Sequence, residues 1–172
     1  MIVALSVAAQ ESVFEKDDNV VNAGIGFGSS LYGGWYTGYS GYNRLPTITL
    51  SYERCIIDNL FNEQSAIGIG AIGGFNYSSH STWTSTSILI GVRAAFHYAF
   101  IDNLDTYAGA MTGYNIHSWK WKGESSSHIH GSSGLAYGVF AGARYYFADP
   151  LAVFAEVGHG YTFLNAGIAL KF

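Results

Sequence analysis

The stretch from Ala152 to Phe172 decides the fold, and it reads Ala-Val-Phe-Ala-Glu-Val-Gly-His-Gly-Tyr-Thr-Phe-Leu-Asn-Ala-Gly-Ile-Ala-Leu-Lys-Phe. From Leu164 onward, one apolar face is made by every second residue: Leu164, Ala166, Ile168, Leu170 and Phe172. A period of two with one apolar face predicts a β-strand. If that face meets lipid, Phe172 falls in the ring of aromatic side chains at a membrane edge.

Composition supports many short strands rather than a soluble helical protein. The 172 residues suffice for one domain, and they include 22 Gly, only 2 Pro, 16% aromatic and 12% charged residues. Mean hydropathy is +0.16, yet no apolar run has the length of a membrane helix. Apolar residues spread over alternate positions are typical of a membrane barrel. The net charge of −4 without a basic cluster excludes a nucleic-acid partner, and the single Cys55 cannot form an internal disulfide.

The same alternation recurs along the chain. Together with the two strands of the opening stretch, we count about eight strands, the others being predicted over 21–27, 47–53, 67–77, 88–98, 106–116 and 137–147. Glycines and charged residues share one face of each strand, and bulky aliphatic residues share the other. In the weaker 106–116 strand we place Ala108, Ala110, Thr112 and Tyr114 outward, although the reverse assignment also fits its pattern.

The connections alternate between short and long. Short turns are predicted at 55–64, 101–103 and 148–150, and longer polar loops at 29–44, 78–85 and 117–134. This pattern predicts an all-β, eight-stranded antiparallel up-and-down transmembrane β-barrel with both termini on the short-turn, periplasmic side. A soluble lipocalin-like barrel is the rival fold, but it would place its apolar residues inside.

The last third of the chain resembles a known family. The segments 142–161, with Gly-Ala-Arg-Tyr-Tyr-Phe-Ala-Asp-Pro at its start, and 164–172 are similar to small Gram-negative outer-membrane β-barrels of the OmpA-like or opacity type, especially those of the Bacteroidetes group. The resemblance implies a bacterial outer-membrane location and contact with outer-membrane lipid and lipopolysaccharide. It also implies that Phe172 is the terminal aromatic read by the barrel-assembly machinery. We further expect a monomer.

The amino-terminal residues 1–9 resemble the end of a signal peptide. Residues 2–9 are mostly apolar, and Val7-Ala8-Ala9 has the small residues of a cleavage site, although a basic start is missing. The mature domain would then span 10–172, with an acidic lead-in over 11–19. An ordinary first strand is the alternative.

Five charged residues lie on the inner parity of their strands: Glu53, Arg93, Arg144, Glu156 and Lys171. Eight strands enclose an interior just wide enough for side chains, where an isolated charge is very costly. We therefore predict an ion-pair network, with Glu156 bound to Arg144 or Arg93. A narrow ion path or a catalytic carboxylate are the alternatives for these charges.

The third long loop is a possible surface-binding segment, defined by Trp119, Lys120, Trp121, Lys122, His128 and His130. Basic and aromatic side chains suit lipopolysaccharide phosphates or another host or envelope surface. His128 and His130 could also reach one Zn²⁺ or Cu²⁺, but solvated histidines explain them as well, and we expect no metal and no cofactor.

Three function classes follow from these patterns. We expect a structural or surface-interaction barrel with a side-chain-plugged lumen and no enzymatic activity. A small low-conductance pore is the alternative. A lipid A-modifying enzyme, using His130, Ser132 and Glu156, is the third hypothesis, but it needs a base and a nucleophile within hydrogen-bond reach.

Overall fold

A computed structural model describes residues 13–29, 42–80, 82–121 and 130–172. The predicted signal-peptide segment 1–9 lies outside these residues. The described chain forms strands β1 (Asn19–Phe27), β2 (Tyr42–Arg44), β3 (Thr47–Asp58), β4 (Ser65–His80), β5 (Trp83–Ile101), β6 (Leu104–Trp121), β7 (His130–Ala148), β8 (Leu151–His159) and β9 (Leu164–Lys171).

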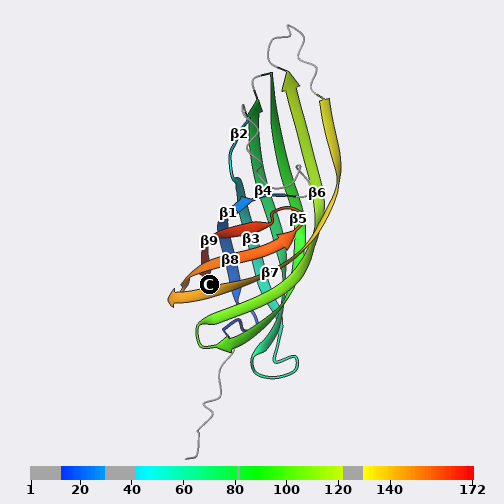
Figure 1. Ribbon diagram of the computed structural model, residues 1–172. Coiled ribbons are helices and arrows are strands. Elements are labelled where there is room, and N and C mark those ends of the chain that lie inside the picture. The colour runs from blue at the N-terminus through cyan, green and yellow to red at the C-terminus, as the bar shows by residue number, and fades with distance from the viewer. Residues whose placement is uncertain (1–12, 30–41, 81, 122–129) are drawn as a thin grey trace, which may run out of the picture.

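Eight of these strands close a ring. Each pairs antiparallel with its neighbour in sequence, from β3 through β9, and β1 joins the two ends by pairing with both β3 and β9. The short β2 adds to the edge of β4 beyond the start of β3. The fold is therefore the eight-stranded antiparallel up-and-down β-barrel that the alternation predicts (Figure 1).

The register shows how the ring closes. Following paired residues from Ile25 through β3, β4, β5 and β6 leads to Ser133 on β7. Following them the other way, through β9 and β8, leads to Ala143 on the same strand. The two positions are ten residues apart, so the strands of this eight-membered ring are tilted by about 40° to the barrel axis.

The two faces of the strands differ as the sequence predicts. The outer face exposes a belt of apolar side chains that includes Ile90, Val92, Val139 and Ile168, each about 60% exposed or more. Ala108, Ala110, Thr112 and Tyr114 are exposed as well, so the outward assignment for 106–116 is correct. The inner face buries polar and charged residues, an arrangement opposite to that of a soluble barrel with an apolar interior.

Three predicted connections are too long. β3 continues to Asp58, β4 and β5 reach His80 and Trp83, and β6 and β7 extend to Trp121 and His130. The predicted loops at 55–64, 78–85 and 117–134 therefore contain strand residues, and β2 lies within the predicted loop 29–44. Backbone pairing needs no apolar side chain, so a strand that leaves the lipid can continue through Ser, Thr and Asn.

The barrel wall has unequal height. β5, β6 and β7 contain 19, 18 and 19 residues, whereas β1, β8 and β9 contain 9, 9 and 8. In Figure 1 the long strands β4 to β7 rise above β8 and β9 on the side opposite the short turns. No helix in the described part of the chain is long and apolar enough to cross a membrane.

The amino-terminal lead-in enters the barrel. Phe14 is buried among inward residues near the short-turn end, including Val20, Cys55 and Tyr146, and its ring centroid lies 4.4 Å from that of His97. The predicted lead-in 11–19 is thus not simply a polar tail, since Phe14 adds an apolar side chain to the interior.

The outer belt gives the first prediction. Val92 lies midway along β5 and faces outward, so Val92→Arg is expected to lower the free energy of unfolding from lipid vesicles by about 2–4 kcal/mol. Urea titration followed by tryptophan fluorescence measures this cost. Thr84→Arg is the matched control, because Thr84 shares the outer face of β5 but lies beyond Ile88, the last apolar side chain there. Equal costs for both variants would contradict a lipid-facing belt.

Candidate functional site

The most concentrated chemistry lies inside the barrel, around Glu53 on β3. Its carboxylate is fully buried. One oxygen lies 2.6 Å from Nε2 of His97, and the other accepts a hydrogen bond from Nη2 of Arg144 at 2.7 Å. Nε of Arg93 lies 3.8 Å from the same carboxylate. Glu53 therefore connects three basic side chains of β5 and β7.

Arg144 is the second junction. Its Nη1 donates to Oδ2 of Asp105 at 2.8 Å, and its Nε donates to the side-chain oxygen of Asn22 at 3.1 Å. Asp105 in turn lies 2.8 Å from Nδ1 of His97. His97 thus lies between two carboxylates, Glu53 and Asp105. Arg144 binds both of them: Asp105 is its directly paired neighbour on β6, and Glu53 lies across the barrel on β3.

Glu156 and Arg93 form the part of the network nearer the loop end. Nη2 of Arg93 lies 2.7 Å from Oε1 of Glu156. Tyr107 donates to the same oxygen at 3.0 Å, and Asn165 donates to the other oxygen at 3.2 Å. The guanidinium of Arg93 also lies 4.1 Å from the ring centroid of Phe140, a cation–π distance.

The charges of this network balance when His97 is protonated. Three carboxylates, from Glu53, Asp105 and Glu156, face two guanidinium groups and one imidazole. A buried charge is tolerated only when it is paired and its hydrogen bonds are made. Removing one member would therefore leave an uncompensated charge in the interior.

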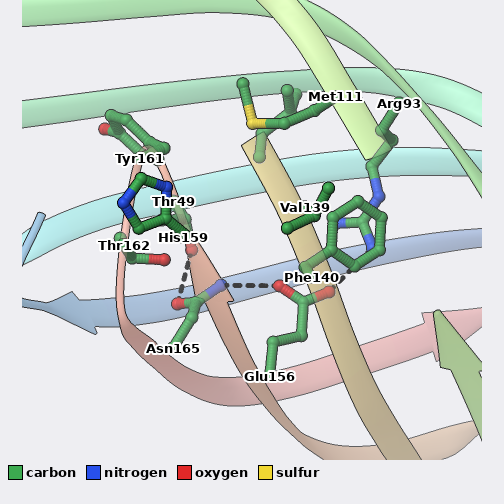
Figure 2. A pocket seen from close by; sticks show the side chains of 11 residues that line it. Thr49, Arg93, Met111, Val139, Phe140, Glu156, His159, Tyr161, Thr162 and Asn165 are labelled. Atoms are coloured by element: carbon green, nitrogen blue, oxygen red, sulfur yellow. Dashed lines mark hydrogen bonds and ion pairs between the residues drawn. The ribbon is translucent and has the colours of Figure 1, made fainter. Parts of the chain in front are cut away.

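Apolar clusters lie on both sides of the network. Toward the short turns, Phe14 packs with Tyr146 and Phe154. Toward the loops, Leu89 and Met111 pack with Tyr161. A cavity of about 30 Å³ lies beside Arg93 and Glu156 and is also lined by His159, Tyr161 and Asn165 (Figure 2). This space suits about one or two water molecules, not a larger ligand.

Inner glycines make room for the network, as the sequence suggests. A Cβ at Gly68 would meet the Glu53 carboxylate and the ring of Phe14. A Cβ at Gly142 would lie 2.8 Å from Cγ of Glu156 and 2.9 Å from Cζ of Tyr107. The missing side chains thus allow bulky inward residues on neighbouring strands.

The structure brings together four of the five predicted charges. Glu53, Arg93, Arg144 and Glu156 share one network, but Lys171 does not belong to it. Nζ of Lys171 lies 3.5 Å from Oδ2 of Asp18 and 3.2 Å from the carbonyl oxygen of Val13. Its position as the last residue of β9 places it at the rim, beside the amino-terminal lead-in.

Of the two partners expected for Glu156, the structure pairs it with Arg93. Arg144 lies on the strand adjacent to Glu156, but its guanidinium turns toward Asp105 and Glu53 instead. Asp105 is the residue paired with Arg144 on its other neighbouring strand, β6, so this contact is also a ladder contact. Glu53 lies across the barrel on β3, and a long guanidinium side chain inside a narrow barrel reaches both carboxylates at once.

Three titratable side chains of the network, those of His97, Asp105 and Tyr107, are absent from the predicted set. His97 lies on the same face of β5 as Arg93, four residues further on, so its parity already placed it inside. Tyr107 and Asp105 share the inner face of β6, but Asp105 fell outside the strand predicted to begin at 106. The inward position of Asp105 becomes visible only when the strand is extended to Leu104.

The other predicted residues lie away from the interior network. Trp119, Lys120 and Trp121 belong to β6 rather than to a loop, and Lys122 and His128 lie outside the described residues. The backbone of His130 pairs with Trp119. Glu156, proposed with His130 and Ser132 for an enzyme, has its carboxylate bound within the network. No group of three or more His, Cys, Asp or Glu side chains arranged to hold a metal ion occurs in 13–29, 42–80, 82–121 or 130–172.

Phe172 lies at the seam between β9 and β1. Its side chain is 66% exposed, and its backbone exchanges two hydrogen bonds of 2.9 Å with Asn19. The exposed ring fits an aromatic at the membrane edge. Its role as an assembly signal stays a prediction.

Comparisons with known proteins agree with this geometry. No family model and no curated protein matches the sequence. A de novo designed transmembrane β-barrel matches 92% of this chain and 98% of its own, with 15% identity and a TM-score of 0.54. The chain has the fold of a transmembrane β-barrel. Ail, the attachment invasion locus protein of Yersinia pestis, is also similar, with 13% identity over 92% of this chain and 100% of its own and a TM-score of 0.51.

The network of the transmembrane barrel gives the second prediction. Glu53→Gln removes the charge that joins Arg144, Arg93 and His97, so the free energy of unfolding in detergent micelles is expected to fall by about 3–5 kcal/mol. Urea titration monitored by far-UV circular dichroism measures the loss.

Glu63→Gln is the matched control, because Glu63 is exposed in the turn after β3. It is expected to change stability by less than about 0.5 kcal/mol. A Glu53→Gln variant as stable as this control would show that the network contributes little to folding.

Proposed function

We propose that the protein is an integral outer-membrane protein of a Gram-negative bacterium whose interior side chains close the lumen. In this proposal the barrel is a rigid scaffold that presents its extended strands at the outer surface. The supporting observation is the buried network of Glu53, Asp105, Glu156, Arg93 and Arg144, which lies between two apolar clusters. The short turns and both ends of the chain would face the periplasm.

Two further features support a role at a surface. β4 to β7 extend well beyond the apolar belt, which a barrel serving only to span lipid does not need. Lys120 lies outside that belt on the outer face of β6, where an ammonium group suits lipopolysaccharide phosphates. One protein of similar fold, Ail, is named for attachment, a use to which such a scaffold is suited.

A small pore is the second candidate. The observation that favours it is the water-sized cavity beside Arg93 and Glu156, because rearrangement of this ion pair would enlarge a space that already exists inside the barrel. The two proposals differ in a measurable property, which is the steady conductance of the native barrel.

Planar-bilayer recording of an ion-pair deletion gives the third prediction. The native protein is expected to show small, rare openings. Removing both members of one pair, in Arg93→Ala with Glu156→Ala, leaves neither of these charges unpaired and enlarges the interior. The double variant is therefore expected to open more often and with a larger conductance.

Arg54→Ala with Asp17→Ala is the control. It removes another ion pair, whose atoms lie 2.6 Å apart, but both side chains are exposed outside the lumen. Its conductance should equal that of the native protein. A high steady native conductance that the Arg93 and Glu156 substitutions leave unchanged would reject the closed scaffold and favour the pore.

A further inference from the structure

The inner face of β5 and β6 carries an aromatic surface above the short strands. Three of the four tryptophans in the chain, Trp83, Trp119 and Trp121, lie on it, and we call this set the Trp face. Trp83 is paired directly with Trp121, and Trp119 is the next inward residue of β6, opposite Ser85. Same-face neighbours of this kind have Cβ atoms about 5–8 Å apart, so the three indoles are close enough to share one surface.

The strand register shows which way this face points. The register of β5 and β6 runs without a shift from Arg93 to Trp83, so the tryptophans share the side of the sheet that carries the interior network. Between the two, Oγ of Ser85 lies 3.3 Å from Nε2 of His117, and Ser87 donates to the side-chain oxygen of Asn115 at 2.7 Å.

The Trp face is not part of an aromatic girdle. A girdle tryptophan points toward lipid at the membrane edge. At the level of the Trp face, the outward residues are Thr84, Ser118 and Lys120, which are polar or charged. The outward-facing apolar side chains of these two strands end at Ile88 and Ile116. The Trp face therefore lies above the apolar belt and points away from lipid.

Among the residues that the structure describes, the opposite barrel wall is too short to cover this surface. β8 ends at His159, which pairs with Val139, whereas β7 continues to His130. Trp119 and Trp121 are 43% and 51% exposed. On the inner side of the neighbouring strand β7, a Cβ at Gly134, which pairs with Asn115, would meet nothing within 4 Å. Within the described strands, a flat ligand can therefore approach the exposed indoles of Trp119 and Trp121 from the side of β8 and β9.

We propose that the Trp face binds a neutral carbohydrate. An indole is a flat apolar surface that matches the C–H-rich face of a pyranose ring, and it retains an N–H donor at its edge. Hydroxyl, imidazole and amide groups of Ser85, His117 and Asn115 lie on the same side of the sheet, where sugar hydroxyls need hydrogen-bond partners. This combination of flat rings and small polar groups suits a sugar better than a lipid tail.

Charge separates a neutral glycan from an anionic one. The inner positions of β5 and β6 that the structure describes above Arg93 contain no Lys or Arg, and Lys120 lies on the outer face. Sulfated or phosphorylated polymers and nucleic acids would require cations beside the stacking surface. The proposal rests on the proposed function only in placing this face at the outer surface of the cell.

Isothermal titration calorimetry on the refolded barrel in detergent tests the proposal. The probes are maltohexaose, cellohexaose, chitohexaose and mannohexaose, with dextran sulfate as the anionic probe. At least one neutral hexasaccharide is expected to bind saturably and independently of salt. Trp119→Ala and Trp121→Ala should each weaken that binding about tenfold or more, because each removes one stacking surface.

Matched variants separate stacking from other effects. Tyr114→Ala removes an exposed aromatic on the outer face of β6, and Lys120→Ala removes the nearby charge, so neither should change binding. Trp119→Phe and Trp121→Phe retain a smaller ring and should weaken binding less than the alanine variants. Heat-dependent migration on gels verifies that each variant is folded. If an alanine variant does not fold, the phenylalanine variants still test the proposal.

Several results would overturn the proposal. These are no binding of any neutral hexasaccharide, binding that the tryptophan variants leave unchanged, or salt-sensitive binding of dextran sulfate alone that Lys120→Ala abolishes. The same variants are recorded in planar bilayers. A conducting native barrel with tryptophan-dependent sugar binding would reject the closed scaffold but keep the glycan site, and a closed barrel without binding would do the reverse.

Discussion

The structure depends on the narrow interior that results when eight tilted strands close a ring. Such an interior is filled by side chains, so a charged group inside it is solvated mainly by its neighbours rather than by bulk water. Glu53 meets this constraint through three basic partners, and Arg144 meets it through two carboxylates and Asn22. The inward residues of β3, β5, β6 and β7 therefore depend on one another, because each charged side chain is paired only when its partners are present.

This coupling explains why glycines and bulky residues alternate inside. Long side chains such as Arg144 and Tyr107 occupy the centre, and glycines on adjacent strands supply the volume. Apolar clusters around Phe14 and around Met111 separate the ion pairs from both openings. Low dielectric strengthens each ion pair, but it also makes an unpaired member costly, so the network is stable only when complete.

The sequence predicts the fold because one face of each strand must be apolar where it meets lipid. The number of strands, the direction in which their side chains point and the short turns after β5 and β7 follow from that rule. The rule fails above the lipid, where Ser85, His117 and Trp119 alternate without an apolar outer face, so the strand ends there could not be predicted. The network is recoverable in part, because parity identifies inward residues such as His97. Parity does not determine which residues pair across the barrel. Arg144 on β7, for example, binds Glu53 on β3, and the alternation of either strand does not predict this contact.

The unequal wall has a consequence for the surrounding bilayer. On β7 the outward apolar residues run from Leu135 to Phe147, but on β9 they run only from Leu164 to Phe172. The difference is about four residues, or on the order of 13 Å along the strand. A flat bilayer of uniform thickness cannot match both sides. Lipid beside β8 and β9 must thin, or the whole barrel must lean toward them, so the protein imposes a direction on the membrane around it.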